Sequence, residues 1–174
     1  MKNSNQNYSS RVAQGKLIEG RILNQMRKKY NYVIDDPSAN EDMYDKIDGW
    51  LHHREFKFGL QIKYRESGDD IIFEIMKDWD KGIEGRDMIC KSDLYIVADR
   101  LGQGYMVKVS SLKTLMSDCL KEIREKGLDH NDEYKTDGIV IKLRKDPYHG
   151  QLKLIGFIEP RRVQVIQKFQ FHLR

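Results

Sequence analysis

Residues 49–65, GWLHHREFKFGLQIKYR, decide how the middle of this 174-residue chain folds. In their second half, the apolar side chains of Leu60 and Ile62 alternate with the polar side chains of Gln61 and Lys63. Successive side chains of a β-strand point to opposite faces of a sheet, so this period of two indicates one packed face and one polar face. The polar residues 54 and 55 separate this strand from the segment WLHH at 50–53. The stretch therefore predicts a β-hairpin with its turn near residues 54–56.

Hydrophobic patterns on both sides of the hairpin predict further elements. Apolar residues recur at helical spacing over residues 11–30 and 112–126, and a short helix is expected within residues 82–91. Strands are expected at residues 31–34, 70–76, 92–99, 105–109, 137–144 and 151–158. Residues 162–174 fit a strand and a helix equally well, because their apolar side chains satisfy both periods.

This order of elements predicts an α/β fold, with a mixed central β-sheet flanked by helices. A chain of 174 residues with 39% hydrophobic residues is long enough for one core. We expect a flexible N-terminal segment at residues 1–10 and a core at residues 11–127. Residues 128–174 are expected to form a β-rich C-terminal extension of the same domain.

The charge balance permits a phosphate-bearing partner without requiring one. Lys and Arg number 31 and Asp and Glu 27, which gives a formal net charge of +4 at pH 7. Cys90 and Cys119 lack the spacing of a zinc site or of a disulfide framework, which favours a reducing, cytoplasmic setting. The polar residues 1–10 and the lack of a long apolar run predict a soluble protein without membrane contact.

A cluster of polar side chains is expected at the open end of the hairpin. Asp48 begins the first strand and is expected to lie across from Lys63, while Gln61 shares the face of Lys63. A carboxylate and an amide oxygen are hard ligands of the kind that Mg²⁺ prefers. A nearby ammonium group can orient an attacking water and offset charge at phosphorus. Asp45 is a rival for Asp48, and Glu19 on the first helix is a further candidate ligand.

These residues resemble the PD-(D/E)XK nuclease superfamily, which includes restriction enzymes, Holliday junction resolvases and intron-encoded endonucleases. The resemblance covers residues 12–116, including the segment SDLYIVADRLGQGYMVKVSSLKTL at 92–115. It implies a restriction-endonuclease-like fold, a mixed four-stranded central sheet with helices on both sides, and metal-dependent hydrolysis of nucleic acid. By position, Asp48 matches the first metal-binding aspartate, Gln61 the second acidic residue and Lys63 the lysine. Glu19 matches the helix carboxylate that some members add.

The chain departs from the superfamily pattern at two places. No proline precedes Asp48, and Gln61 replaces an acidic residue, although a neutral amide binds metal less strongly than a carboxylate. Gln stands at this place in some members, among them a tetrameric intron-encoded homing endonuclease. The resemblance implies a Mg²⁺-dependent DNA endonuclease, with Mn²⁺ as a possible substitute, that cuts duplex DNA as a homing or restriction-like enzyme. A homodimer or homotetramer is expected, because cutting two strands needs two active sites.

Four basic side chains and one histidine are candidates for nucleic-acid contacts: Lys57, Arg65, Arg86, Lys145 and His149. Residues 145–150 are expected at a hairpin tip that can enter a groove. An ordinary charged surface explains these residues about as well. His52 and His53 are adjacent in a strand and point to opposite faces, so they are not expected to share a metal.

Three other functions remain open. The chain can be a structure-specific Holliday junction resolvase that reads shape and phosphates, or a non-catalytic nucleic-acid-binding module on a nuclease-like fold. The segments KIDG at 46–49 and DGIVIK at 137–142 also resemble motifs of ATP-dependent nucleotidyltransferases such as DNA and RNA ligases. That resemblance implies Lys46 as the nucleophile that takes AMP and Lys142 as a phosphate contact.

Overall fold

The computed structural model describes residues 3–65, 70–78, 81–126, 137–142, 149–154 and 161–173, and it shows a mixed α/β fold. Its helices are α1 (Asn3–Lys29), the short α2 (Arg86–Ile89) and α3 (Val109–Lys126). A π-helical turn, η1, spans Glu41–Asp45. None of the helices described is both long and apolar enough to cross a membrane.

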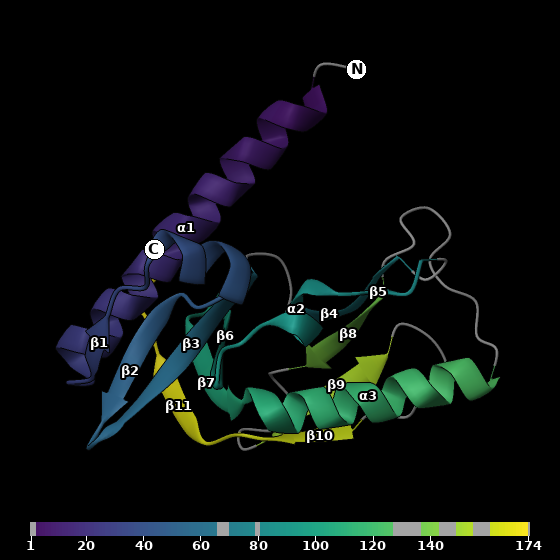
Figure 1. The fold of residues 1–174 in the computed structure, drawn as a ribbon. Coiled ribbons are helices and arrows are strands. Elements are labelled where there is room, and N and C mark those ends of the chain that lie inside the picture. The colour runs from purple at the N-terminus through teal and green to yellow at the C-terminus, as the bar shows by residue number, and fades with distance from the viewer. Residues whose placement is uncertain are drawn as a thin grey trace.

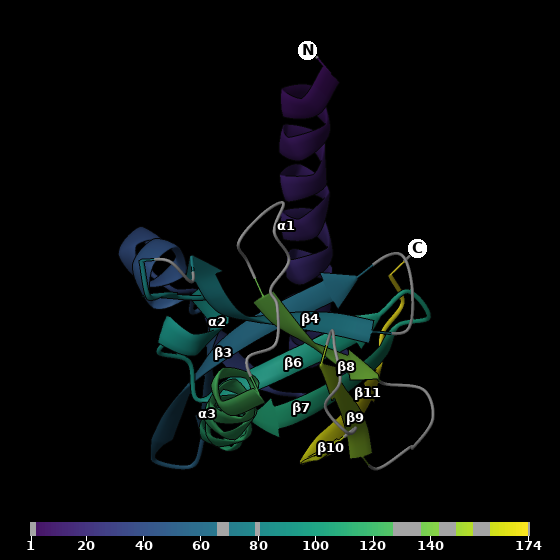
Figure 2. The same cartoon turned by 90° about the vertical axis from the view of Figure 1, so that its right-hand side faces the viewer.

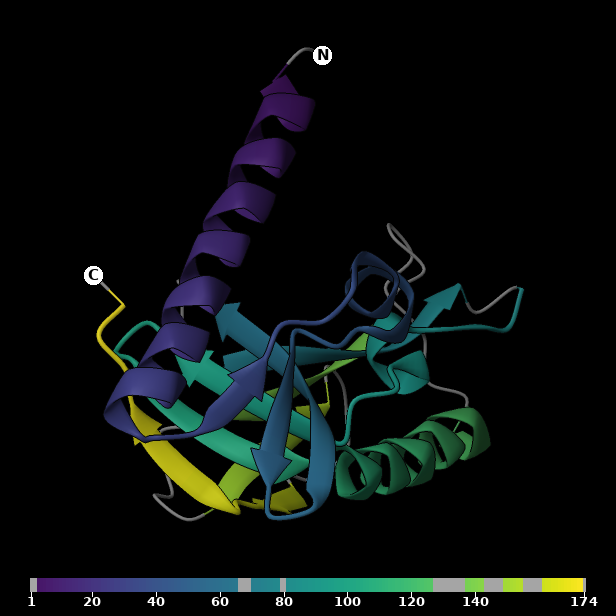
Figure 3. The same ribbon diagram turned by 60° about the vertical axis from the view of Figure 1, so that its left-hand side comes forward.

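A curled sheet of six strands forms the centre of the fold (Figure 3). Its order is β1-β2-β3-β6-β7-β11. Only β3 and β6 pair in parallel among these strands; the other neighbours are antiparallel. The strand bounds are β1 (Val33–Asp35), β2 (Gly49–His53), β3 (Phe56–Arg65), β6 (Leu94–Asp99), β7 (Gln103–Lys108) and β11 (Gln167–Gln170).

A second sheet of five antiparallel strands lies beside α3 and α2 (Figure 1). Its order is β10-β9-β8-β4-β5, so strands from the middle and the end of the sequence meet here. The bounds are β4 (Asp70–Asp78), β5 (Ile83–Glu84), β8 (Asp137–Lys142), β9 (His149–Leu154) and β10 (Arg161–Gln164).

Helices cover both faces of the six-stranded sheet, and Figure 2 shows α1 and α3 on different sides of it. Strand β6 explains this arrangement, since all six of its residues are buried. Ile96 packs in one core cluster with Ile22 and Met26 of α1, whereas Val97 packs in the other with Leu112 of α3. Alternate side chains of one central strand thus serve two cores, as expected for a strand covered on both faces.

Most predicted elements are present, with two differences. The first helix begins at Asn3 rather than at residue 11, and it includes most of the segment 1–10. The ambiguous tail forms the strands β10 and β11 and not a helix. Residues 128–174 were expected as a β-rich extension of the same domain, and their described strands join both sheets, since β8 pairs with β4 and β11 pairs with β7.

The hairpin predicted at residues 49–65 is present, but its register differs from the expected one. Gly49 pairs with Leu60, so the pairing extended by one residue sets Asp48 opposite Gln61 and not opposite Lys63. The two-residue turn at Arg54 and Glu55, which pairs His53 with Phe56, fixes this register. Arg54 takes a left-handed conformation in this turn, with φ of 54°.

Side chains of α1 hold the last residue of β11 and the segment that follows it. Arg21 Nη1 donates to the carbonyl oxygen of Leu173 at 3.0 Å, and Lys29 Nζ to that of Gln170 at 2.8 Å. Gln25 makes two bonds to the backbone of His172, donating at 2.9 Å and accepting at 2.8 Å. Residues four apart on a helix share one face, so Arg21, Gln25 and Lys29 form a row along this segment. They anchor α1 to the sheet edge.

Gly102→Ala is expected to destabilise the protein by at least about 2 kcal/mol. Gly102 has φ of +77°, and a Cβ there would lie 1.9 Å from the carbonyl oxygen of Phe171. Gly20→Ala in α1 is the matched control, because a Cβ there meets nothing within 4 Å. It should stabilise the helix by about 1 kcal/mol. Urea unfolding measures both effects, and a Gly102→Ala variant as stable as the wild type would contradict the close contact.

Candidate active site

A cavity of about 290 Å³ lies between α1, η1, β3 and α2. It has room for a phosphate group together with several water molecules. Its lining is rich in charge of both signs. Four basic side chains, three acidic side chains and one amide border it: Lys16, Lys46, Lys63, Arg86, Glu19, Asp42, Asp48 and Gln61. All four of the predicted catalytic residues, Glu19, Asp48, Gln61 and Lys63, therefore line the same cavity.

Asp48 and Gln61 form the buried floor of the cavity. They are 7% and 6% exposed. Oδ2 of Asp48 accepts hydrogen bonds from Nε2 of Gln61 at 3.0 Å and from the backbone N–H of Ile62 at 2.5 Å. A carboxylate only accepts, so the amide nitrogen of Gln61 must face it. Oε1 of Gln61 is then left buried without a hydrogen-bond partner, which makes it available to a ligand.

Glu19 places a second carboxylate above this floor. It lies on α1, and its side chain is 21% exposed. Burial raises the pKa of Glu19 to about 7, and the negative charge of Asp48 contributes to the shift. Burial likewise raises the pKa of Asp48 to about 6, although the bond from Ile62 and the charge of Lys63 act in the opposite direction. Two carboxylates that disfavour each other's charge form a site suited to a cation.

The positive side of the cavity is built by Lys63 and Lys16. Lys63 Nζ lies 2.9 Å from Oδ1 of Asp87, a fully buried carboxylate on α2. Lys16 Nζ lies 2.6 Å from Oδ2 of Asp42 and 3.8 Å from Oε1 of Glu19. Both ammonium groups are thus held at the cavity wall by carboxylates.

Without divalent ions, these carboxyl groups are expected to make stability fall as the pH rises. On folding, the pKa of Asp48 rises from 3.8 to about 6 and that of Glu19 from 4.5 to about 7. Between these values the folded protein holds more protons than the unfolded chain, so raising the pH favours unfolding. Urea unfolding in chelator at about pH 5 and about pH 7.5 measures the slope. Glu19→Gln should make it shallower, and equal slopes for variant and wild type would contradict the assignment.

The cavity fits a magnesium ion by the nature of its oxygen ligands. Magnesium keeps several waters and needs only one or two carboxylates from the protein. Glu19, Asp48 and the unpartnered Oε1 of Gln61 supply such a set. No group of three His, Cys, Asp or Glu side chains suited to a metal occurs in the described part of the chain. The candidate set therefore depends on the amide of Gln61 as its third ligand.

The predicted nucleic-acid contacts are found in different places. Arg86 lines the cavity, whereas Lys57 and Arg65 do not. Lys57 Nζ lies over the ring of Trp50, 4.4 Å from its centroid, and Arg65 ends β3. Lys145 lies outside the described residues. His149 begins β9, and its side chain also lies outside the description.

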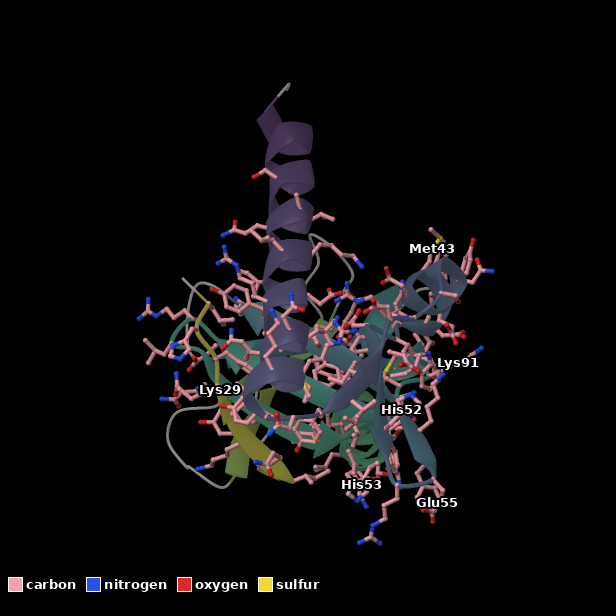
Figure 4. All side chains as sticks on the ribbon, turned by 90° about the vertical axis from the view of Figure 1, so that its left-hand side faces the viewer. Lys29, Met43, His52, His53, Glu55 and Lys91 are labelled. Atoms are coloured by element: carbon pink, nitrogen blue, oxygen red, sulfur yellow. The ribbon has the colours of Figure 1, made fainter. Side chains whose placement is uncertain are left out.

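The rival candidates are engaged away from the cavity floor. Asp45 Oδ1 pairs with Lys91 Nζ at 2.7 Å, and Asp45 does not line the cavity. His52 Nε2 lies 2.7 Å from Oδ2 of Asp35, while His53 is exposed at the hairpin end, as Figure 4 shows. Lys46 lines the cavity and donates to the carbonyl oxygen of Met43.

The sequence interpretation missed Asp87, Lys16 and Asp42. Lys16 had a detectable signal, because it precedes Glu19 by three residues and therefore shares its helix face. Asp42 lies in η1, within a segment expected to be a loop. Asp87 had no clear signal, because it follows the charged residues Glu84 and Arg86 within the short predicted helix.

No protein-family model, no curated protein and no solved structure matches this chain. The resemblance to the PD-(D/E)XK superfamily therefore depends on the residues of the cavity and on the order of the elements around it.

Proposed function

We propose that the protein is a Mg²⁺-dependent DNA endonuclease that hydrolyses phosphodiester bonds. The observation that carries the proposal is the buried Oε1 of Gln61, which has no hydrogen-bond partner beside the carboxylate of Asp48. A buried polar atom without a partner is unfavourable. Among the described side chains with such an atom, that of Gln61 lines the charged cavity, where a ligand can reach it. A cation between two carboxylates is the ligand that the charges favour.

The strand order supports a restriction-endonuclease-like fold. Strands β2, β3, β6 and β7 are neighbours and pair antiparallel, parallel and antiparallel in turn. Helices α1 and α3 cover opposite faces of these strands. A mixed four-stranded centre with helices on both sides is what the superfamily resemblance implies. Asp48 directly precedes β2 and Lys63 lies near the end of β3, and the resemblance expects a metal-binding aspartate and a lysine at these positions.

The residues have separate roles in the proposed reaction. Asp48, Gln61 and Glu19 would hold Mg²⁺, or Mn²⁺ in its place. When bound, the ion polarises the scissile phosphate and lowers the pKa of a bound water. Lys63 presents its ammonium to the same cavity, where it orients the attacking water and offsets charge on the phosphate oxygens. Arg86, also at the cavity, neutralises a neighbouring phosphate.

We infer that the substrate is double-stranded DNA cut in both strands at specific sites, as homing and restriction-like enzymes do. One cavity cuts one strand, so the protein would act as a homodimer or homotetramer with paired cavities. Base contacts would come from surfaces outside the cavity, because the cavity residues are suited to phosphate and metal and not to base edges.

Cleavage assays test the proposal directly. The full chain is incubated with supercoiled plasmid, a random-sequence duplex library or a synthetic four-way junction, in Mg²⁺, Mn²⁺ or chelator. The expected result is duplex cleavage that requires the metal, with cut ends that share a sequence. Cutting of the junction alone would indicate a resolvase instead. DNA binding without cutting in either metal would indicate a binding module, and a protein–AMP adduct formed with ATP would point to Lys46.

Gln61→Glu is expected to retain cleavage and to lower the Mg²⁺ concentration needed for it. A carboxylate binds Mg²⁺ more strongly than an amide, because it adds a negative charge. In the metal-free protein the new carboxylate would face Asp48 and lose the bond of 3.0 Å, so stability at neutral pH should fall. Metal titrations of cleavage and urea unfolding in chelator measure the two effects. Complete loss of cleavage with the fold intact would show that the amide itself is required.

A further inference from the structure

Lys63 is held by a carboxylate that lies outside the hairpin. Oδ1 of Asp87 is 2.9 Å from the ammonium nitrogen of Lys63, an ion pair that lacks the angles of a hydrogen bond. The Lys63 side chain is 14% exposed and that of Asp87 is 0% exposed, so the pair is screened from water on the carboxylate side. Arg86 Nε is 3.7 Å from the same oxygen, but its side chain is 49% exposed. Lys63 is thus the nearer and the more buried partner.

The other oxygen of Asp87 is fixed by the second sheet. Oδ2 accepts a hydrogen bond from the backbone N–H of Glu74 in β4, at 2.8 Å. Gly85, which precedes α2, seats this short helix on the same strand. Its N–H donates to the carbonyl oxygen of Ile75 at 2.9 Å, and a Cβ at this position would lie 2.4 Å from the carbonyl oxygen of Glu74. Figure 1 shows α2 next to β4. Asp87 therefore joins the second sheet to the lysine of the first.

We propose that Asp87 is the positioning residue for Lys63 in the nuclease reaction, an inference that rests on the function proposed above. A lysine side chain has many rotamers, and fixing one of them before the substrate binds removes an entropic cost from the reaction. Asp87 fixes it with one oxygen while the other oxygen is tied to the backbone of β4. Asp87 does not touch the substrate, because it is fully buried. Asp87 acts indirectly, by fixing the position of the Lys63 ammonium group.

Asp87→Asn separates this role from a purely structural one. Asparagine keeps an oxygen that can accept the N–H of Glu74, but its NH₂ group cannot accept from an ammonium. The fold should therefore persist while the position of Lys63 is lost. In Mg²⁺ and duplex DNA, kcat should fall about 100-fold with KM unchanged. Asp45→Asn is the matched control, since Asp45 pairs with Lys91 and does not line the cavity. It should leave kcat unchanged.

A second measurement does not depend on activity. NMR of protein labelled with ¹⁵N-lysine should show a slowly exchanging ammonium signal for Lys63, which is identified by its absence from Lys63→Arg. The signal should be lost in Asp87→Asn and kept in Asp45→Asn. If Asp87→Asn does not fold, the wild-type spectrum alone tests the inference. A Lys63 ammonium signal that exchanges slowly with water supports the inference, and the absence of such a signal overturns it.

The two proposals fail in different ways. A wild-type protein that cleaves and an Asp87→Asn variant with the same kcat would overturn the role of Asp87 and leave the nuclease proposal intact. An Asp87→Asn variant with a raised KM and an unchanged kcat would also overturn this role, because the positioning of Lys63 acts on the chemical step and not on substrate binding. A wild-type protein that cuts no DNA in either metal would refute the nuclease function itself, and with it a role for Asp87 in catalysis.

Discussion

Replacing Asp48 with asparagine is expected to lower Mg²⁺ affinity at least about 100-fold, since even partners of metal ligands contribute 10- to 100-fold. Metal-dependent cleavage should be lost with it. The carboxylate of Asp48 is the most buried charge at the cavity floor, and burial raises its pKa to about 6. Isothermal titration with Mg²⁺ measures the affinity, and the plasmid assay measures cleavage.

Stability distinguishes this effect from simple damage to the fold. Burial disfavours the charged form of Asp48, so the neutral asparagine should leave the metal-free protein at least as stable as the wild type at neutral pH. Replacing a residue that binds a ligand often leaves stability unchanged or raises it, because such a residue lowers the stability of the ligand-free protein. Asp45→Asn should bind Mg²⁺ and cleave like the wild type. An Asp48→Asn variant that is clearly less stable and still binds Mg²⁺ would show that Asp48 is a structural residue.

Replacing Lys63 with methionine is expected to reduce cleavage by about 10²- to 10³-fold, the usual effect of removing one stabilising donor from a reaction. The variant should also be destabilised by about 3 kcal/mol, because the buried Asp87 keeps only the more distant and more exposed Arg86 as a cationic neighbour. DNA binding, measured by gel shift in Ca²⁺ or chelator, should persist. Rates and urea unfolding of the same preparation give both values.

Lys63→Arg is the matched control for the charge. Arginine supplies Asp87 with a cation, so most of the stability should return, but its planar guanidinium cannot occupy the place of the ammonium. Cleavage should therefore stay low while the fold is restored. If Lys63→Met cleaves at the wild-type rate, Lys63 has no catalytic role, and β3 supplies no cationic catalyst to the cavity.

The sequence predicted the central strands because their local patterns are unambiguous. The alternation of Leu60 and Ile62 with Gln61 and Lys63 identified β3 and the face on which two candidate residues lie. Glu19 was predicted as a further site residue, because the helical spacing of its neighbours placed it on the first helix and the superfamily resemblance implied a carboxylate there. The register could not be predicted, because it depends on a two-residue turn in which Arg54 takes a left-handed conformation, and residues 54 and 55 lack the Gly or Asn that marks such a turn in a sequence.

Contacts between distant segments set the limit of the sequence interpretation. Strand β8 was expected, but nothing in residues 137–142 indicates that they pair with β4. The role of Asp87 depends on that second sheet, because Glu74 of β4 fixes one of its oxygens. The tail was ambiguous because two periods fitted it. The burial of Phe169 and Phe171 in one core decides for the period of two.

The anchoring of α1 by the backbone of residues 170–173 has a consequence for biosynthesis. Translation delivers the helix with Glu19 first, whereas its hydrogen-bonding partners are as much as 152 positions further along the chain. Such long loops close slowly and only when both ends are free of the ribosome. Until residues 167–173 are translated, core contacts with β3 and β6 can hold α1, and the cavity that Glu19 lines gains the support of these hydrogen bonds last.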